Sequence, residues 1–497
     1  MTLRLDPASV QRLRAALAAA SYTVDGVSAL VGESAHRALA RNETTPALRR
    51  TRDGSALATL TRLWPLQSVV SADEAERALP GLVDPLCRAG VLERSVAEVR
   101  ARVDLRPYAD DERGWWVMSD LTPGLDGGPS RVGSDHVLGI SAASGSLAGL
   151  TIRDQVDTAL DLGTGCGVQS LHLAGHSRHV VGTDVNQRAL AMAAINAALN
   201  EVDVDLRDGS LFDSVRGERF DLIVTNPPFV VSPGPSGRER LVYRDSGLPG
   251  DEVVRRIVTG AGDRLNPGGW CQVLANWVHR EGEPWQQRLT DWLRPTGCDA
   301  WVLQREVTDL PEYVELWLAD AGLRGAPDYA RRYDTWLSWF AEQGIEAVGF
   351  GWVCLHRAER EVPELRIEHW PYEVEQPLGP HVADWGRRTR WLAEQADLDT
   401  TYLTVGADVA QESTAAPGAE HPSHIVLRQQ RGLRRAVQVD TVQAGLVGAC
   451  DGELSVGQIL DALAVLVERP AAELRRDYLP KVRELVADGI LRPPDPR

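Results

Sequence analysis

The fold of this chain is decided by the stretch VDTALDLGTGCG at residues 156–167, in which an apolar run ends in three closely spaced glycines. The apolar run has the length and composition of a buried strand. Gly163, Gly165 and Gly167 allow a tight turn that approaches a ligand closely, because glycine adopts backbone conformations that other residues avoid. Residues 168–176 read as a helix whose first N–H groups face that turn. The pattern predicts a strand, a binding loop and a helix in succession.

Strand and helix patterns alternate over the following residues. Strands are expected at 179–185, 202–206, 220–225 and 270–278, and helices at 188–200 and 251–265. This alternation favours a parallel, doubly wound sheet of the Rossmann-like α/β class. The ligand of such a sheet lies at the carboxyl ends of its strands. Two further strands are expected at 301–307 and 347–357, separated by a helical insertion rich in tryptophan and tyrosine.

Both ends of the chain have a helical pattern. Residues 1–108 read as short helices that end at Gly90 and a small strand, and residues 431–497 repeat this signature with Gly489 in the corresponding position. We therefore predict a winged-helix-like domain at each end. A chain of 497 residues is long enough for several domains. The parts expected between the ends are an α/β domain at 109–358 with its helical insertion near 308–344, and an accessory α+β segment at 359–430 with a linker at 412–422.

Charge and hydropathy limit the classes of partner. The formal net charge is −17, which disfavours non-specific binding to nucleic acid. Residues 1–110 carry 15 arginines against 13 acidic residues, so the N-terminal part is the more suitable platform for a polyanion. No run of eighteen apolar residues is present, and the first residues lack the apolar segment of a signal peptide. We expect a cytoplasmic protein that does not contact the membrane.

The six cysteines are scattered along the chain. They form no CxxC pair and have no histidine at metal-ligand spacing, which argues against a zinc site and against a disulfide framework. We expect them to be small buried side chains, and we expect no metal site.

Two carboxylates follow the next predicted strands. Asp184 lies 21 residues beyond Gly163, where a carboxylate can accept hydrogen bonds from both hydroxyls of a ribose. Asp208, in RDGSLFD at 207–213, lies beside the same crevice, where it could accept from an adenine amino group. Capping of a helix by Asp184 and of a turn by Asp208 are the alternatives. The glycine loop itself is neither G-x-G-x-x-G nor a phosphate loop, since no lysine follows it.

The stretch VTNPPFV at 224–230 places an asparagine and two prolines at the end of a further buried strand. Proline has a fixed φ and no N–H, so the pair stiffens the turn and directs a carbonyl into the crevice. Asn226 Oδ1 and the carbonyl of Pro227 can each accept one N–H of a planar amine or amide. Phe229 can offer a flat face for stacking. The alternative is an Asn-Pro turn that only ends the strand.

In this order, the motifs DLGTGCG, TDVN, RDGSLFD and NPPF resemble the class I S-adenosylmethionine-dependent methyltransferases. The resemblance is to the small-domain N-methyltransferase branch, akin to the ribosomal RNA guanine-N2 and release-factor glutamine methyltransferases, and covers about residues 130–280. It implies S-adenosyl-L-methionine as the cofactor, with its amino group near Asp161 and its methyl group facing Asn226. The residues that it assigns to cofactor binding are Asp161, Gly163, Thr164, Gly165, Gly167, Asp184, Asp208, Leu211 and Asn226.

The resemblance also implies the reaction. Such enzymes methylate a nitrogen conjugated to a planar system, whose delocalised lone pair is a poor nucleophile. Asn226, Pro227 and Phe229 are the expected catalytic residues, and positioning and pre-aimed dipoles are expected to supply most of the rate. Residues 231–258 resemble the substrate-side loop, for which a solvated loop is the alternative. The substrate-binding residues expected there and in the motif are Pro228, Arg238, Arg240 and Arg244.

Several functions remain open at this point. An N-methyltransferase acting on an exocyclic base amine of RNA, or of DNA, is favoured by NPPF and VLANWV and by the expected winged helices, although the net charge opposes it. A protein glutamine methyltransferase is favoured by YRDSGLPGDEVVRRIV, but that group usually has tyrosine at the position of Phe229. Methylation of a small molecule and a non-enzymatic docking scaffold are further alternatives. We expect a macromolecular substrate, with RNA favoured over protein; the oligomeric state is open.

Overall fold

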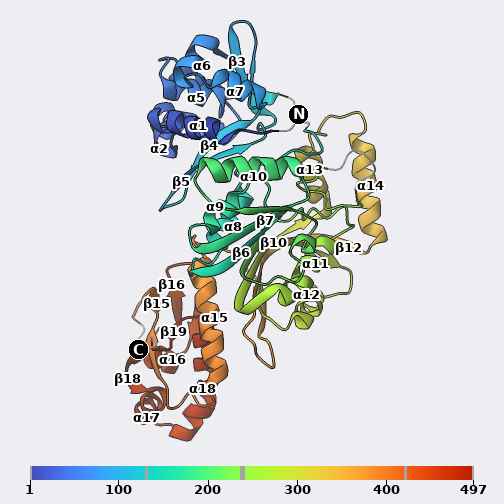
Figure 1. Ribbon diagram of the computed structural model, residues 1–497. Coiled ribbons are helices and arrows are strands. Elements are labelled where there is room, and N and C mark those ends of the chain that lie inside the picture. Colours follow the sequence, from blue (N-terminus) through green and yellow to red (C-terminus); the bar gives the residue numbers. More distant parts are fainter. Residues whose placement is uncertain (1–2, 129–131, 235–240, 419–421, 495–497) are drawn as a thin grey trace. The chain divides into compact units, whose positions relative to one another are not determined.

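The computed structural model describes residues 3–128, 132–234, 241–418 and 422–494 (Figure 1). The chain divides into two compact units. The first comprises Met1–Ala148 and Asp154–His369, and the second comprises Gly149–Arg153 and Trp370–Arg497. Each unit contains its own clusters of buried apolar side chains.

An eight-stranded sheet lies at the centre of the first unit, in the order β13-β11-β12-β10-β9-β6-β7-β8 (Figure 1). Its strands are β6 (Val156–Leu162), β7 (Ser177–Asp184), β8 (Asp205–Asp208), β9 (Phe220–Thr225), β10 (Leu265–Arg280), β11 (Asp299–Asp309), β12 (Ile345–His356) and β13 (Leu365–His369). Neighbours are parallel except around β12, which is antiparallel to β10 and to β11. The predicted Rossmann-like α/β class is confirmed.

The antiparallel strand follows from the helical insertion. Helices α13 (Leu310–Asp320) and α14 (Tyr329–Glu342) connect the end of β11 to the start of β12. Because β12 pairs along β11 without a crossover, it must run in the opposite direction. The insertion therefore stays at the end of the sheet where β11 finishes, close to the ends of the parallel strands.

The strand order reverses beside β6. The chain runs outward from β6 through β7 to the edge strand β8, and then returns to the other side of β6 as β9. The helices α9 (Val168–Leu173) and α10 (Gln187–Leu199) follow β6 and β7, whereas α11 (Glu252–Ala261) and α12 (Trp285–Leu293) follow β9 and β10. A crevice opens at such a switch point, outside the carboxyl ends of β6 and β9.

The N-terminal residues form small helices and a three-stranded sheet. The elements are α1 (Pro7–Ala19), α2 (Val24–Val31), α3 (Glu33–Leu39), α4 (Thr45–Arg50), α5 (Ala56–Leu63), β1 (Val70–Ser71), α6 (Ala72–Ala78), α7 (Val83–Arg88), β2 (Leu92–Arg94) and β3 (Glu98–Ala101). The sheet order is β1-β3-β2. This order of helices and strands is compatible with a winged helix, and that assignment stays a prediction.

A hairpin joins this N-terminal part to helix α10. It consists of β4 (Asp104–Ala109) and β5 (Gly114–Ser119). Asn200 accepts from the main-chain N–H of Trp116 (2.9 Å) and donates to its carbonyl (2.8 Å). Asn196 makes the same pair of bonds with Met118, at 2.7 and 2.8 Å. Asn196 and Asn200 are four residues apart on the helix, and Trp116 and Met118 are two residues apart on the strand. Both spacings correspond to about 6 to 7 Å, so the two asparagine side chains pair with β5 as a neighbouring strand would.

Three predicted boundaries differ from the structure. The boundary between 108 and 109 falls inside β4, and β13 extends the sheet beyond the boundary between 358 and 359. The boundary between 430 and 431 falls inside the second unit, because β14 (Tyr402–Val405) pairs with strands on its far side. Composition could not predict these boundaries, because the pairing of two strands distant in the chain cannot be recognised from the sequence of either strand alone.

The second unit holds two small sheets, β18-β14-β19 and β15-β16-β17. Its other elements are α15 (Gly379–Glu394), β15 (Val409–Thr414), β16 (His424–Gln429), β17 (Ala436–Val439), α16 (Thr441–Gly448), β18 (Asp451–Ser455), α17 (Val456–Leu466), α18 (Ala471–Ala487) and β19 (Leu491–Arg492). The linker expected at 412–422 is partly strand, since 412–414 belong to β15, which pairs with β16. Its Pro and Gly residues mark the connection of a hairpin, of which 419–421 lie outside the described residues. The winged-helix assignment of this end also stays a prediction.

Within the described ranges, no helix combines the length and the apolar character needed to cross a bilayer. The cysteines are free thiols, and all except the half-buried Cys87 are buried.

We expect Asn196→Ala to lower the free energy of unfolding by about 3 kcal/mol, since it leaves several buried backbone groups unpaired at about 1–3 kcal/mol each. Asn196 is fully buried, and its Nδ2 also donates to the carbonyl of Cys166 at 2.7 Å. Urea unfolding followed by tryptophan fluorescence measures the change. Asn200→Ala is the matched comparison and should cost less, because Asn200 is half-buried and water can replace its bonds. Equal losses for the two variants would contradict this account.

Candidate active site

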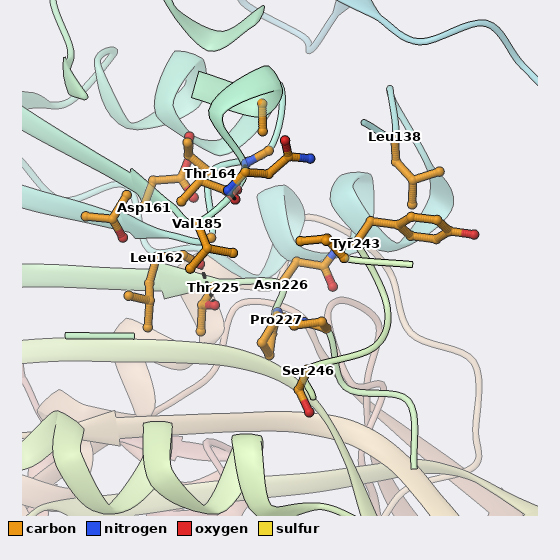
Figure 2. A pocket seen from close by; sticks show the side chains of 18 of the residues that line it. Leu138, Asp161, Leu162, Thr164, Val185, Thr225, Asn226, Pro227, Tyr243 and Ser246 are labelled. Carbon is orange, nitrogen blue, oxygen red and sulfur yellow. Dashed lines mark hydrogen bonds between the residues drawn. The ribbon is translucent and has the colours of Figure 1, made fainter. Parts of the chain in front are cut away.

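A cavity of about 520 Å³ lies at the carboxyl ends of β6 and β9 (Figure 2). It is in the size range of a small-molecule site. The residues expected from the sequence that line it are Asp161, Gly163, Thr164, Gly165, Asp184, Leu211, Asn226, Pro227 and Pro228. The structure thus brings together most of the expected site, from four segments of the chain.

The glycine loop is fixed to the end of β7. The N–H groups of Gly163 and Thr164 both donate to the carbonyl of Thr183, at 2.9 and 2.8 Å. Gly163 and Gly165 have φ of 76° and 55°, and an added Cβ at either would meet nothing within 4 Å. The left-handed conformation, rather than lack of space, therefore requires glycine at these positions.

Gly167 has a different role from the one expected. It does not line the cavity, so its assignment to cofactor binding is not supported by the structure. Its φ is 88°, and an added Cβ would lie 3.4 Å from the Cβ of Ala193. Gly167 allows the start of α9 to approach α10 closely, and this packing holds the end of the glycine loop in position.

Asp161 is buried near the end of β6, with 1% of its surface exposed. Its Oδ2 accepts three hydrogen bonds, from Thr164 Oγ1 (2.6 Å), Ser170 Oγ (2.7 Å) and Ser170 N (2.9 Å). Burial nevertheless raises the pKa of Asp161 from 3.8 to about 6. A carboxylate of this kind is stabilised by a cationic group that enters the cavity.

Asp184 ends β7 and is held by the backbone of two loops. Its Oδ2 accepts from Gly165 N (2.9 Å) and its Oδ1 from Asn186 N (2.8 Å). Burial raises the pKa of this carboxyl. Each oxygen keeps a further lone pair for a donor in the cavity, which suits a pair of hydroxyl groups.

Asp208 does not line the cavity, contrary to expectation. It ends the edge strand β8, its side chain is exposed, and it borders a groove between α1 and α10. The loop that follows it turns into the cavity instead, through Gly209, Ser210 and Leu211. The adenine-binding role predicted for Asp208 is therefore not supported, whereas Leu211 lies where it was expected.

Asn226 follows the last residue of β9 and faces the cavity beside Pro227 (Figure 2). Thr225 Oγ1 donates to the carbonyl of Leu162 at 2.6 Å, which fixes the end of β9 against β6. Asn226 Oδ1 is buried and has no hydrogen-bond partner among the described residues. An unpaired buried acceptor costs about 1–3 kcal/mol, so this oxygen is suited to a donor supplied by a ligand.

Phe229 does not line the cavity, which corrects the stacking role predicted for it. Its ring centroid lies 5.8 Å from that of Phe350 and 6.4 Å from that of Trp317. Its backbone forms an isolated bridge with Asp245. Phe229 therefore packs against aromatic side chains of β12 and α13 at the edge of the core. Sequence reasoning did not predict that these side chains lie here.

Arg244 also points elsewhere than expected. It is 6% exposed, and its Nη1 donates to the carbonyl of Trp317 (2.6 Å) and to Asp320 Oδ2 (3.2 Å). Arg244 fastens its loop to α13 and does not line the cavity. Arg238 and Arg240 lie outside the described residues.

One segment of the lining was missed, His136–Ser144, of which six residues line the cavity. The predicted loop at 231–258 does reach the cavity, but through Tyr243 and Ser246, which sequence reasoning did not single out, and not through Arg244. Burial lowers the pKa of His136, whose Nδ1 lies 3.8 Å from Asp120 Oδ2. The segment His136–Ser144 has no regular periodicity, and its Gly and Ser residues before α8 (Ala142–Leu150) were the available signal for it.

Three family descriptions match this chain. The methyltransferase small domain matches residues 143–290, which include the glycine loop and the Asn-Pro-Pro-Phe motif. Residues 19–102 and 383–493 each match a domain of unknown function, DUF7059 and DUF7782 respectively.

Curated relatives share this central region. A release factor glutamine methyltransferase of Geobacter sulfurreducens is 38% identical over 23% of this chain and 43% of its own length. A putative protein N5-glutamine methyltransferase of Methanocaldococcus jannaschii is 30% identical over 27% of this chain and 71% of its own length. The ribosomal RNA small subunit methyltransferase C of Erwinia tasmaniensis is 30% identical over 35% of this chain and 46% of its own length.

The chain belongs to the S-adenosylmethionine-dependent methyltransferases with a methyltransferase small domain. It spans less than half the length of the first relatives that it matches. Residues 103–142 and 291–382 lie outside the three matches, and the second of these segments contains β11, the helical insertion, β12 and β13.

We expect Asp184→Ala to weaken binding of S-adenosylhomocysteine by about 1.5–3 kcal/mol, since it removes two partly buried acceptors from a pair of hydroxyls. Titration calorimetry measures the affinity. Asp213→Ala is the matched control, because Asp213 is an exposed carboxylate that pairs with Arg216 at 3.1 Å and does not line the cavity. Unchanged affinity in the Asp184 variant would show that this carboxylate does not hold the ribose.

Proposed function

We propose that this chain is an S-adenosylmethionine-dependent N-methyltransferase that acts on a nitrogen conjugated to a planar system. The observation that carries the proposal is the buried Asn226 Oδ1, an acceptor without a partner among the described residues, on the wall of the switch-point cavity. An NH2 group brings the donor that this oxygen lacks. Pro227, buried beside it, offers its main-chain carbonyl as a second acceptor.

The residues of the cavity fit the cofactor. Asp161 suits the cationic amino group of its methionine portion, and Asp184 suits its ribose diol. Asp161 is buried and Asp184 is half-buried, and burial raises the pKa of both carboxyls, so ligand groups of this kind stabilise their charged forms. The glycine loop lies between them and lines the cavity with its backbone.

When bound, S-adenosylmethionine would supply a methyl group: the N–C bond forms as the S–C bond breaks, S-adenosylhomocysteine is the leaving group, and the methylated nitrogen loses one proton to water. Asn226 and Pro227 hold the two N–H groups of the acceptor and so orient its lone pair. They also stabilise the positive charge that develops on the nitrogen, since both are fixed acceptors aimed at its protons. The Asn-Pro-Pro turn needs no reorganisation as this charge appears, because its prolines fix the backbone.

An exocyclic base amine of RNA is the first acceptor that we propose. The ribosomal RNA relative aligns over a larger share of this chain than the glutamine methyltransferase relatives described above. The excess of arginine in residues 1–110 supports contact with a polyanion. The amine of guanine or adenine presents two N–H groups in one plane, as the pair of acceptors requires.

The side-chain amide of a protein glutamine is the second acceptor. It is favoured by the identity to glutamine methyltransferases and by the charge of the cavity, whose described lining contains Asp161 and Asp184. Among the described residues that line the cavity, Arg256 is the one arginine. Its charge is already paired, because its Nε donates to Glu252 Oε1 at 2.8 Å. A neutral amide does not need the cations that a phosphate backbone attracts.

We expect the affinity for S-adenosylhomocysteine to rise with pH through about 6, the raised pKa of Asp161. Below that pH the carboxyl of Asp161 is protonated and cannot balance the cationic amino group, whereas above it the affinity levels off. Calorimetry at a series of pH values between about 5 and 8 measures this dependence. Asp161→Asn should bind more weakly and lose the dependence. A slope that persists in that variant would assign it to another group.

We expect Asn226→Ala to lower kcat by about 10²-fold or more while cofactor affinity stays nearly unchanged, because the lost acceptor acts mainly on the developing charge. The assay uses cofactor with a radioactive methyl group and a lysate from a strain that lacks this gene. Digestion with ribonuclease or with protease then shows whether RNA or protein carries the label. Asn266→Ala is the matched control, since Asn266 lies near the start of β10, at the other end of the sheet. Normal turnover in the Asn226 variant would overturn its role.

A further inference from the structure

The acceptor side of the cavity has an aromatic wall that the Asn-Pro-Pro-Phe motif does not provide. Tyr243 lines the cavity together with Asn226, Pro227 and Pro228, whereas Phe229 does not. Figure 2 shows the ring of Tyr243 on the same side of the cavity as Asn226, with Leu138 beside it. The residue that offers a flat face next to the proposed acceptor site is therefore Tyr243.

The ring of Tyr243 is held in place from two directions. Its hydroxyl donates to Asp320 Oδ2 at 2.9 Å, and burial raises the pKa of this phenol, which keeps the donor protonated. The ring of His136 lies edge-on to it, with centroids 5.8 Å apart. Tyr243 thus has a defined orientation before any ligand enters.

The backbone around Tyr243 is also anchored. Val242 N donates to the carbonyl of Ser134 at 3.0 Å, and Val230 N donates to the carbonyl of Arg244 at 3.3 Å. Arg244 in turn holds α13 through Asp320 and a main-chain carbonyl. The helical insertion therefore fixes the position of Tyr243, although it does not itself line the cavity.

Phe229 is occupied elsewhere. It packs against Trp317 and Phe350 and belongs to the edge of the core of the sheet. The segment after it is fixed as well, because Val231 N donates to the hydroxyl of Tyr313 at 2.9 Å, and Asn276 Nδ2 donates to the same oxygen. Turning Phe229 into the cavity would break these aromatic contacts.

We propose that Tyr243, and not Phe229, is the wall against which the planar acceptor group lies while Asn226 holds its N–H groups. This assignment rests on the function proposed above. Asp320 is the positioning residue, because it acts on the acceptor through the hydroxyl of Tyr243. The substrate class is a flat, conjugated group such as a base or a primary amide, since only a planar group can contact the ring and present both N–H groups to Asn226 and Pro227.

The test measures the rate of methyl transfer from labelled cofactor at increasing concentrations of acceptor. The acceptor is the RNA or protein fraction that carries the label in the digestion experiment described above. We expect Tyr243→Leu to raise KM for the acceptor about 10-fold or more, because the flat contact between the acceptor and the aromatic ring is lost. Affinity for S-adenosylhomocysteine should change less than about twofold. Tyr372→Leu is the matched control, because Tyr372 is 63% exposed and lies in the other unit.

Three further variants separate the roles. Phe229→Leu should lower the melting temperature and leave KM for the acceptor near that of the wild type. Tyr243→Phe keeps the ring and should raise KM by a smaller factor than Tyr243→Leu. If Asp320 acts through the hydroxyl, adding Asp320→Asn to Tyr243→Phe should cause no further rise in KM.

The outcomes distinguish the two proposals. If the wild-type protein transfers methyl groups and Tyr243→Leu keeps a normal KM, or if Phe229→Leu raises KM in its place, the assignment of Tyr243 is wrong and the proposed function stands. If the wild-type protein binds S-adenosylhomocysteine but methylates neither RNA nor protein, the proposed function and the assignment of Tyr243 are both wrong.

Discussion

The site depends on one constraint: the glycine loop after β6 is fastened along its length, first to the end of β7 and then to α10. Gly163 and Thr164 donate to the end of β7, Gly165 donates to Asp184, and the carbonyl of Cys166 accepts from Asn196. A loop of this kind has little freedom to rearrange, so its backbone and the carboxylate of Asp184 line the cavity in a fixed geometry. Preorganisation of this sort is the main source of both affinity and rate in polar sites.

The same arrangement carries a cost in stability. Asp161 and Asp184 are carboxylates whose burial raises their pKa, and Asn226 keeps a buried oxygen without a partner among the described residues. Each of these features opposes folding, because buried polar groups lose their hydration. The surrounding sheet offsets this cost with its apolar core, and a ligand relieves it. Polar groups left in this condition along one cavity are typical of a binding site rather than of a core.

Parts of the chain outside the matched small domain support the site from two sides. Helix α10 connects the loop to the N-terminal hairpin through Asn196, so the hairpin and the glycine loop share one side chain. The insertion α13–α14 anchors the loop that carries Tyr243. These contacts give the N-terminal part and the insertion a physical role in the geometry of the cavity, separate from any contact with a substrate.

The sequence by itself determined the doubly wound sheet, the glycine loop, Asp184 and Asn226, because the loop and both side chains follow predicted strands and parallel strands end at one edge of the sheet. The family resemblance of the motifs added Asp161. The sequence could not place Asp208, Phe229 or Arg244, nor find His136 and Tyr243. The directions of those side chains were decided by tertiary structure: an edge strand exposes Asp208, and the aromatic residues of α13 and β12 draw Phe229 and Arg244 away from the cavity. Local spacing encodes where a strand ends, whereas the direction of a side chain in a loop depends on partners distant in the chain.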